Sequence, residues 1–142
     1  MDSLAALDRP RIVVLAVRLL WGSLLLGVPV TIYDMFQPEP GVPMWLNIVA
    51  TLFGWLIGFG ISYWLYTAAW RGRGWSRIVQ AVLLALGVLA IPVIMKIAPQ
   101  IIRMLQLHVV IIYLVQNLIG IAAVGMLFSP SANAWYRAMR HH

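Results

Sequence analysis

Charged side chains are scarce in this 142-residue sequence: they make up 10% of it, against 63% hydrophobic residues. A soluble domain typically carries about a quarter charged residues, because water must wet its surface. A water-soluble form of this chain would expose large apolar patches and aggregate. The composition therefore predicts that lipid surrounds the outside of the protein.

Cysteine is absent, which excludes disulfides, thiol chemistry and cysteine metal sites. The only acidic residues, Asp2, Asp8, Asp34 and Glu39, fall in end or loop segments. Proton-coupled pumps usually place a carboxylate or a histidine relay inside the membrane, so this class is disfavoured. The sequence also lacks a phosphate-binding glycine loop and a nucleophile–base pattern. We therefore expect no enzymatic activity, no cofactor and no metal.

Four long apolar runs dominate what is present, at residues 11–33, 45–70, 78–97 and 101–128. A spanning helix needs roughly 20 apolar residues, so four spans use most of the chain and leave one membrane domain, residues 1–142. A proline-rich loop at 34–44 and a basic turn at 71–77 separate the runs, and Pro92 predicts a kink. We predict an all-α integral membrane protein, a bundle of four transmembrane helices with an amphipathic interfacial tail at 132–142.

Positive charge is distributed unevenly around these runs. With the N-terminus inside, seven arginines lie on the inner side, whereas Lys96 and Arg103 lie on the outer side. The positive-inside rule then predicts that both termini are cytoplasmic. Because the arginines flank apolar runs, we attribute the net charge of +6 to anionic headgroups and expect no nucleic-acid partner.

The second apolar run carries small residues at every fourth position: Ala50, Gly54, Gly58 and Ser62. Small side chains at this spacing let two membrane helices approach closely. The ridge is expected to pack inside the four-helix bundle; the alternative is a seam between two copies.

The fourth run carries a polar stripe of Gln106, Tyr113, Asn117 and Gly120, with Gln116 beside it. Amides at mid-span need hydrogen-bond partners, because hydrocarbon offers none. We interpret the stripe as polar contacts between helices. The alternative is a patch that meets a ligand or lines a path.

Arg18 lies within the first span, away from both of its ends. It lies six residues past Ile12, about 9 Å of helical rise, so its side chain can reach the inner headgroups. His108 is the only histidine in a span and is expected to be a buried, hydrogen-bonded residue. A weaker alternative makes His108 a ligand in a cofactor-bearing complex.

Three segments together resemble a group of uncharacterised small bacterial inner-membrane proteins. They are Arg9-Pro10 leading into AVRLLW (16–21), the turn GRGWSRIV (72–79) and the ending LFSPSANAWYR (127–137). Proteins of that group have four predicted spans, a G-R-N-W-A-R-like turn and an LLF-x-P ending followed by an aromatic pair. Gly74 and Ser76 here replace the asparagine and alanine of that turn. The resemblance implies the bacterial inner membrane and no particular activity.

Basic and aromatic residues in these motifs suit an interfacial role. Arginine meets anionic lipid, and tryptophan sits at headgroup depth. The predicted headgroup-contacting residues are Arg18, Arg71, Arg73, Trp75, Arg77, Trp135 and Arg137.

The function expected from these features is that of a non-enzymatic accessory, scaffolding or lipid-contacting membrane protein. Its expected partners are membrane lipids, a second copy of the chain or another membrane protein. The alternative is a small homo-oligomeric transporter or channel for an anion or amphiphile. Its substrate would meet Tyr113, Gln116 and Asn117, with Arg18 as an optional further contact.

Overall fold

The computed structural model describes residues 8–37, 41–97 and 107–139. These residues form helices only, in the order α2 (Arg11–Leu26), α3 (Val28–Met35), α4 (Met44–Trp70), α5 (Gly74–Ile97), α7 (Leu107–Leu127) and α8 (Pro130–Ala138). Four stretches are long and apolar enough to cross a membrane: Arg11–Tyr33, Met44–Trp70, Gly74–Val93 and Val109–Leu127. The all-α fold and its four candidate membrane spans are thus confirmed.

The first span differs from the single continuous helix that was predicted, because it is interrupted at Gly27. Pro29 lies two residues later, and a proline has no amide hydrogen to donate while its ring crowds the carbonyl four residues back. The Gly27 amide turns back to the Leu24 carbonyl at 3.2 Å, and α3 restarts with the Thr31 amide bonded to the Gly27 carbonyl at 3.0 Å. The span therefore consists of two helical segments, α2 and α3.

Two other boundaries also move. The predicted basic turn at 71–77 is shorter, because α5 begins at Gly74 and takes in Ser76 and Arg77. The predicted tail begins earlier, since Pro130 occupies the first turn of α8 and the Ser129 hydroxyl accepts the Ala132 amide as an N-cap. Residues 98–106 and 140–142 lie outside the described residues, so the predicted helix start at 101 and the end of the tail stay untested.

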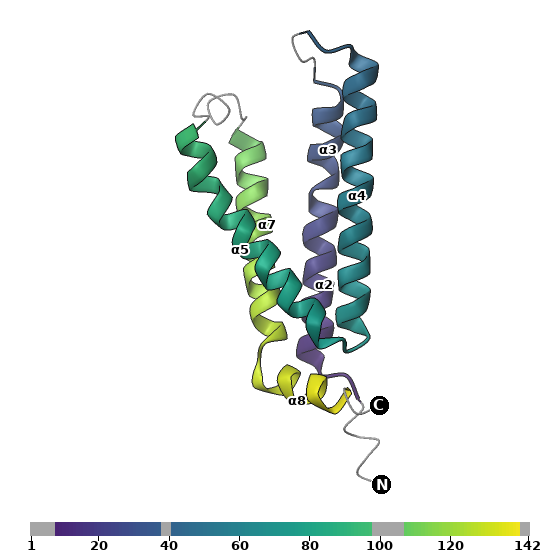
Figure 1. The fold of residues 1–142 in the computed structure, drawn as a ribbon, viewed down its shortest axis with the longest axis vertical. Helices are drawn as coiled ribbons and strands as arrows, with labels where there is room; N and C mark the ends of the chain where they lie inside the picture. The colour runs from purple at the N-terminus through teal and green to yellow at the C-terminus, as the bar shows by residue number, and fades with distance from the viewer. Residues whose placement is uncertain (1–7, 38–40, 98–106, 140–142) are drawn as a thin grey trace.

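The spans form two antiparallel pairs that meet at one end and diverge toward the other (Figure 1). One pair consists of α2 and α3 beside α4, and the other consists of α5 beside α7. The most extensive packing joins α2 to α7, and α8 lies across the end where the pairs meet, which we call the base. The buried core is at this base: Val13, Ala16, Leu20, Ala123, Val124, Leu127, Ala132, Trp135 and Tyr136.

The turn between α4 and α5 sits directly on α8. Gly72 has a φ of +77°, and its amide bonds to the Ala69 carbonyl while the Arg73 amide bonds to the Ala68 carbonyl. These two bonds form a Schellman motif, which requires the left-handed conformation that glycine adopts most easily. A Cβ on Gly72 would lie 2.9 Å from Met139 Cγ and 3.2 Å from Trp135 Cη2. Glycine therefore both ends α4 and makes room for α8.

Aromatic and arginine side chains hold α8 against the base. The Tyr136 hydroxyl donates to the Ala69 carbonyl at 3.0 Å, and the Arg9 guanidinium stacks 3.7 Å over the Trp70 ring. Trp135 and Tyr136 are only 4% and 1% exposed. The prediction that Trp135 contacts lipid headgroups is therefore wrong, because this ring packs against the protein.

Arg77 fastens the corner between α7 and α8. Its Nη1 donates to the Leu127 carbonyl at 3.2 Å and to Asn133 Oδ1, and its guanidinium lies over the rings of Phe128 and Tyr136. Charge-assisted hydrogen bonds of this kind are stronger than neutral ones. The Nη1 group of Arg77, a residue predicted to contact headgroups, thus bonds to the protein, while its buried Nε has no partner among the described residues.

We expect the base to loosen in alkaline solution because of Tyr136. Burial raises the pKa of Tyr136 to about 12, although the positive charges of Arg77 and Arg9 oppose this rise. The unfolded chain loses the proton near pH 10 and the folded chain only near pH 12, so the stabilisation is complete below pH 10 and lost as the pH rises through that window. Unfolding of the detergent-solubilised protein should show this loss as the pH rises from 10.0 to about 12. Tyr136→Phe should lack that component; an equal pH dependence in both proteins would contradict it.

Candidate functional site

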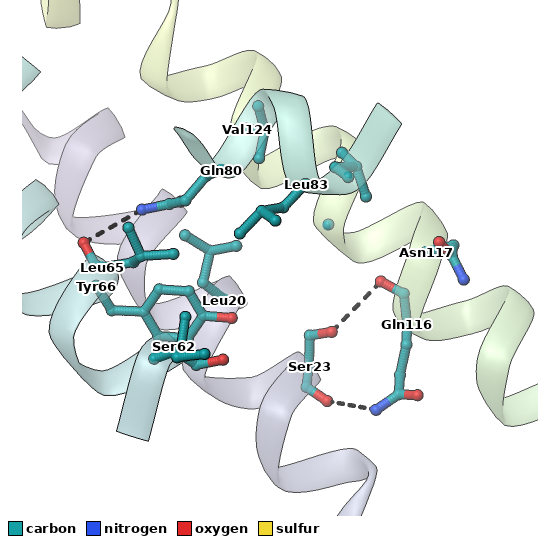
Figure 2. Close-up of a pocket in the computed structure, with 13 residues that line it drawn as sticks. Leu20, Ser23, Ser62, Leu65, Tyr66, Gln80, Leu83, Gln116, Asn117 and Val124 are labelled. Atoms are coloured by element: carbon teal, nitrogen blue, oxygen red, sulfur yellow. Dashed lines mark hydrogen bonds between the residues drawn. The ribbon is translucent and has the colours of Figure 1, made fainter. Parts of the chain in front are cut away.

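A cavity of about 290 Å³ lies between the four spans (Figure 2). Its wall contains apolar groups such as Leu20, Leu83 and Val124 and a set of uncharged polar residues. Every spanning element except α3 contributes at least one polar residue: Ser23 from α2, Ser62 and Tyr66 from α4, Gln80 from α5, and Gln116 and Asn117 from α7. The fold thus gathers scattered polar residues around one space in a largely apolar molecule.

A second cavity of about 440 Å³ adjoins the first, and Ser62 and Gln116 line both. Its wall adds Thr31 of α3, Trp55 of α4 and Tyr113 of α7. It lies where the two helix pairs diverge, so we call the two cavities together the crevice. Ser23, Ser62 and Gln116 lie near the middles of their candidate spans, and so does the junction of the two cavities.

Ser23 and Gln116 join α2 to α7 through two reciprocal hydrogen bonds (Figure 2). The Gln116 Nε2 donates to the Ser23 carbonyl at 2.8 Å, and the Ser23 hydroxyl donates to the Gln116 carbonyl at 3.3 Å. Gly27 makes room for this amide, since a Cβ there would lie 2.7 Å from Gln116 Nε2. The structure therefore supports the interpretation of Gln116 as a polar contact between helices, and it gives Ser23 as the partner.

Gln80 is the most deeply buried polar side chain of the crevice, at 5% exposed. Its Nε2 donates to the Leu65 carbonyl at 3.3 Å and so links α5 to α4. Its Oε1 is buried without a hydrogen-bond partner among the described residues. Gln80 was not predicted from the sequence, although a lone amide inside an apolar run is a signal for a polar site.

The predicted stripe on the fourth run divides between three surroundings. Gly120 packs against α5, where its Cβ position lies 3.3 Å from Leu84 Cδ1. Asn117 lines the inner cavity but donates to the Tyr113 carbonyl of its own helix at 2.8 Å. Tyr113 is 53% exposed and lines the outer cavity. Gln106 lies outside the described residues, and among the others only Gln116 forms a side-chain hydrogen bond with another described helix.

The small-residue ridge of α4 is largely open. Ala50, Gly54 and Gly58 are exposed, and a Cβ on either glycine would meet no described atom within 4 Å. Packing of the ridge inside the bundle was the expected outcome and is not found at Gly54 or Gly58. The physical reason is the divergence of the helix pairs, which keeps the α5–α7 pair away from this part of α4. Gly58 lines the outer cavity of the crevice, and Ser62, at the lower end of the ridge, lines both cavities.

The basic residues lie apart from the crevice. Arg18 is exposed and borders a separate groove between α2 and α4, together with Trp21 and Trp70. Arg71, Arg73, Trp75 and Arg137 are exposed at the base, where contact with headgroups stays a prediction. The alternative in which one substrate meets both Arg18 and the amides of α7 does not fit this geometry. The side chain of His108 lies outside the described residues.

The crevice offers hydrogen bonds and apolar contact, and its described lining holds no charged side chain. Within the described ranges, no group of three or more histidine, cysteine or acidic residues is placed to hold a metal ion. A guest in this space can be recognised by hydroxyl and amide groups at one place and by aliphatic or aromatic walls elsewhere.

Comparison with protein-family models, with curated proteins and with solved structures finds no match. The resemblance to small bacterial inner-membrane proteins therefore stays a prediction. Its three motifs nevertheless have a common location here, since Arg9, the turn at Gly72 and the ending at Trp135 meet at the base. This location gives the motifs a structural role in joining α8 to the bundle.

Proposed function

We propose that this chain is a non-enzymatic protein of the bacterial inner membrane, with both termini cytoplasmic, that binds a membrane amphiphile in the crevice. The observation that carries the proposal is the ring of uncharged polar side chains at mid-span, with Ser62 and Gln116 shared by both cavities. Polar groups at this depth need partners, and Gln80 Oε1 of this ring finds none among the described residues. Ligand sites in helical membrane proteins commonly lie between helices in this way.

The proposed orientation of the protein in the membrane is supported by the excess of arginine at the base. Arg11, Arg71, Arg73 and Arg137 are all exposed around α8, while the opposite end carries the loop from 34 to 44 without a positive residue. A cytoplasmic base agrees with the positive-inside rule. The divergent end of the helix pairs then faces the outer leaflet, from which an amphiphile enters the crevice sideways.

The test is to count the lipids that remain bound after gentle extraction, using native mass spectrometry. We expect one retained lipid per chain, and we expect Ser62→Leu to lose it, because the leucine side chain occupies the junction of the two cavities. Gly54→Leu is the matched control on the same helix, since open space surrounds its Cβ position. Equal lipid retention in wild type and Ser62→Leu would refute the proposal.

The same spectra test a second candidate, an accessory role in which a partner helix covers the α4 ridge. This role is supported by the open space at Gly54 and Gly58, and by the absence of buried residues in the most apolar stretch of α4. A partner protein in fixed ratio, released by Gly54→Leu but retained by Ser62→Leu, would favour it. A closed homo-oligomer released by the same variant would favour a seam between copies.

A further inference from the structure

We infer that the guest of the crevice is a neutral lipid with a free hydroxyl group, of the diacylglycerol type. The inference rests on the proposed function and names the chemical class of its ligand. The site is uncharged: the described lining of both cavities contains serine, threonine, tyrosine, asparagine and glutamine but no acidic or basic side chain.

A charged headgroup is disfavoured at this depth. Moving an ionised group into low dielectric is costly unless an opposite charge pairs with it. Among the described residues, Arg18 borders a different groove, Arg77 bonds to Leu127 and Asn133 at the corner between α7 and α8, and the exposed base arginines are at the end of the bundle. A phosphate or an ammonium in the crevice would therefore find no counter-charge among the described residues, whereas a hydroxyl group needs only hydrogen bonds.

The guest must donate a hydrogen bond, because the unsatisfied atom of the site is an acceptor. Gln80 lines the inner cavity at 5% exposed, and its Oε1 has no partner while its Nε2 is held by the Leu65 carbonyl. A buried acceptor without a donor destabilises the fold, so a donor that enters the cavity is favoured there. In the occupied state we expect the Gln80 amide to turn toward the cavity and accept the hydroxyl of the guest.

The apolar walls of the outer cavity indicate the structure of the rest of the guest molecule. The outer cavity adds Trp55, Phe59 and Val30 around the shared Ser62 and Gln116, and it lies where the helix pairs diverge. Aliphatic chains fit this apolar section and continue from it into the surrounding lipid. A molecule with a small uncharged hydroxyl end and long chains matches both sections of the crevice.

The test compares dioleoylglycerol with its 3-O-methyl ether, which has the same chains but no hydroxyl donor. Delipidated wild-type protein is titrated with each in mild detergent, and native mass spectrometry reports the bound fraction. We expect the alcohol to bind roughly tenfold more tightly than the ether, the effect of one buried hydrogen bond. Gln80→Met should reduce this preference to less than about twofold, whereas Thr67→Val, whose hydroxyl bonds only to its own helix, should keep it.

The outcomes separate the two proposals. Equal binding of alcohol and ether by the wild type would overturn the hydroxyl inference and leave an amphiphile site standing. Dioleoylphosphatidylglycerol bound in preference, and lost in Ser62→Leu, would overturn the neutral class. Binding of none of the three lipids would count against the proposed function itself. If Gln80→Met fails to fold, the comparison of alcohol and ether on the wild-type protein still tests whether the guest needs a free hydroxyl group.

Discussion

Replacing Gly72 with valine is expected to detach α8 from the base and to give the largest loss of stability of any single change considered. Gly72 has a φ of +77°, which costs an L-residue about 1–2 kcal/mol and a β-branched residue more. The new side chain would also start 2.9 Å from Met139 and 3.2 Å from Trp135. Both terms act together, since the turn cannot relax without moving α8. Denaturation in mixed detergent–SDS micelles, followed by tryptophan fluorescence, measures the loss.

Gly41→Val is the matched control for this prediction. Gly41 has a similar φ of +81°, yet a Cβ there meets no described atom within 4 Å. Its substitution therefore carries the backbone strain without the steric conflict. We expect Gly72→Val to be clearly less stable than Gly41→Val, and protease access to Arg137 to rise in the former alone. If the two variants lost equal stability, contact between the turn and α8 would contribute nothing.

Gly27→Leu is expected to separate α2 from α7. A Cβ at this position lies 2.7 Å from Gln116 Nε2, so the leucine displaces the amide that bonds to the Ser23 carbonyl. Overpacking typically costs about 1–3 kcal/mol, and a half-buried amide left without its partner adds up to about the 1–3 kcal/mol of a fully buried one. Gly27 has an ordinary helical φ of −75°, so backbone strain is not a factor. The free energy of SDS-induced unfolding should fall by the sum of these two effects.

The control for Gly27→Leu is Gly22→Leu, one and a half turns earlier in the same helix. Gly22 has open space around its Cβ position, and leucine has a higher helix propensity than glycine. We expect this variant to be as stable as the wild type or slightly more stable. A comparable loss in both variants would mean that the effect of Gly27 comes from α2 itself and not from its contact with α7.

The helices were the predictable part of this protein, and particular residues show why. Apolar runs of about 20 residues have only one stable form in lipid, because each backbone polar group must be bonded within its own segment. The end of α4 at Trp70 and the last residue of α5, Ile97, therefore match their predicted positions. The break at Gly27 could also have been predicted, because Pro29 lies in the first run and proline interrupts helices. A search for apolar length alone does not detect it.

The site was only partly predictable. Gln116 was expected to bond to another helix because an amide at mid-span must find a partner, but nothing in the sequence said that Ser23 is that partner. Gln80 was overlooked, and Trp135 was assigned to lipid on the basis of its usual preference for interfaces. Its actual partners, Arg9 and the turn at Gly72, come from segments far away in the chain.

By itself the sequence determined the medium and the secondary structure of this protein, because both follow from local composition: too little charge for water, and enough apolar length for four spans. Tertiary structure alone decided which polar residues share a crevice, that the α4 ridge stays open at Gly54 and Gly58, and that α8 closes the base. These features depend on how helices approach one another. In lipid that approach is governed by close packing and a few hydrogen bonds between residues distant in sequence, and the hydrophobic pattern carries no record of them.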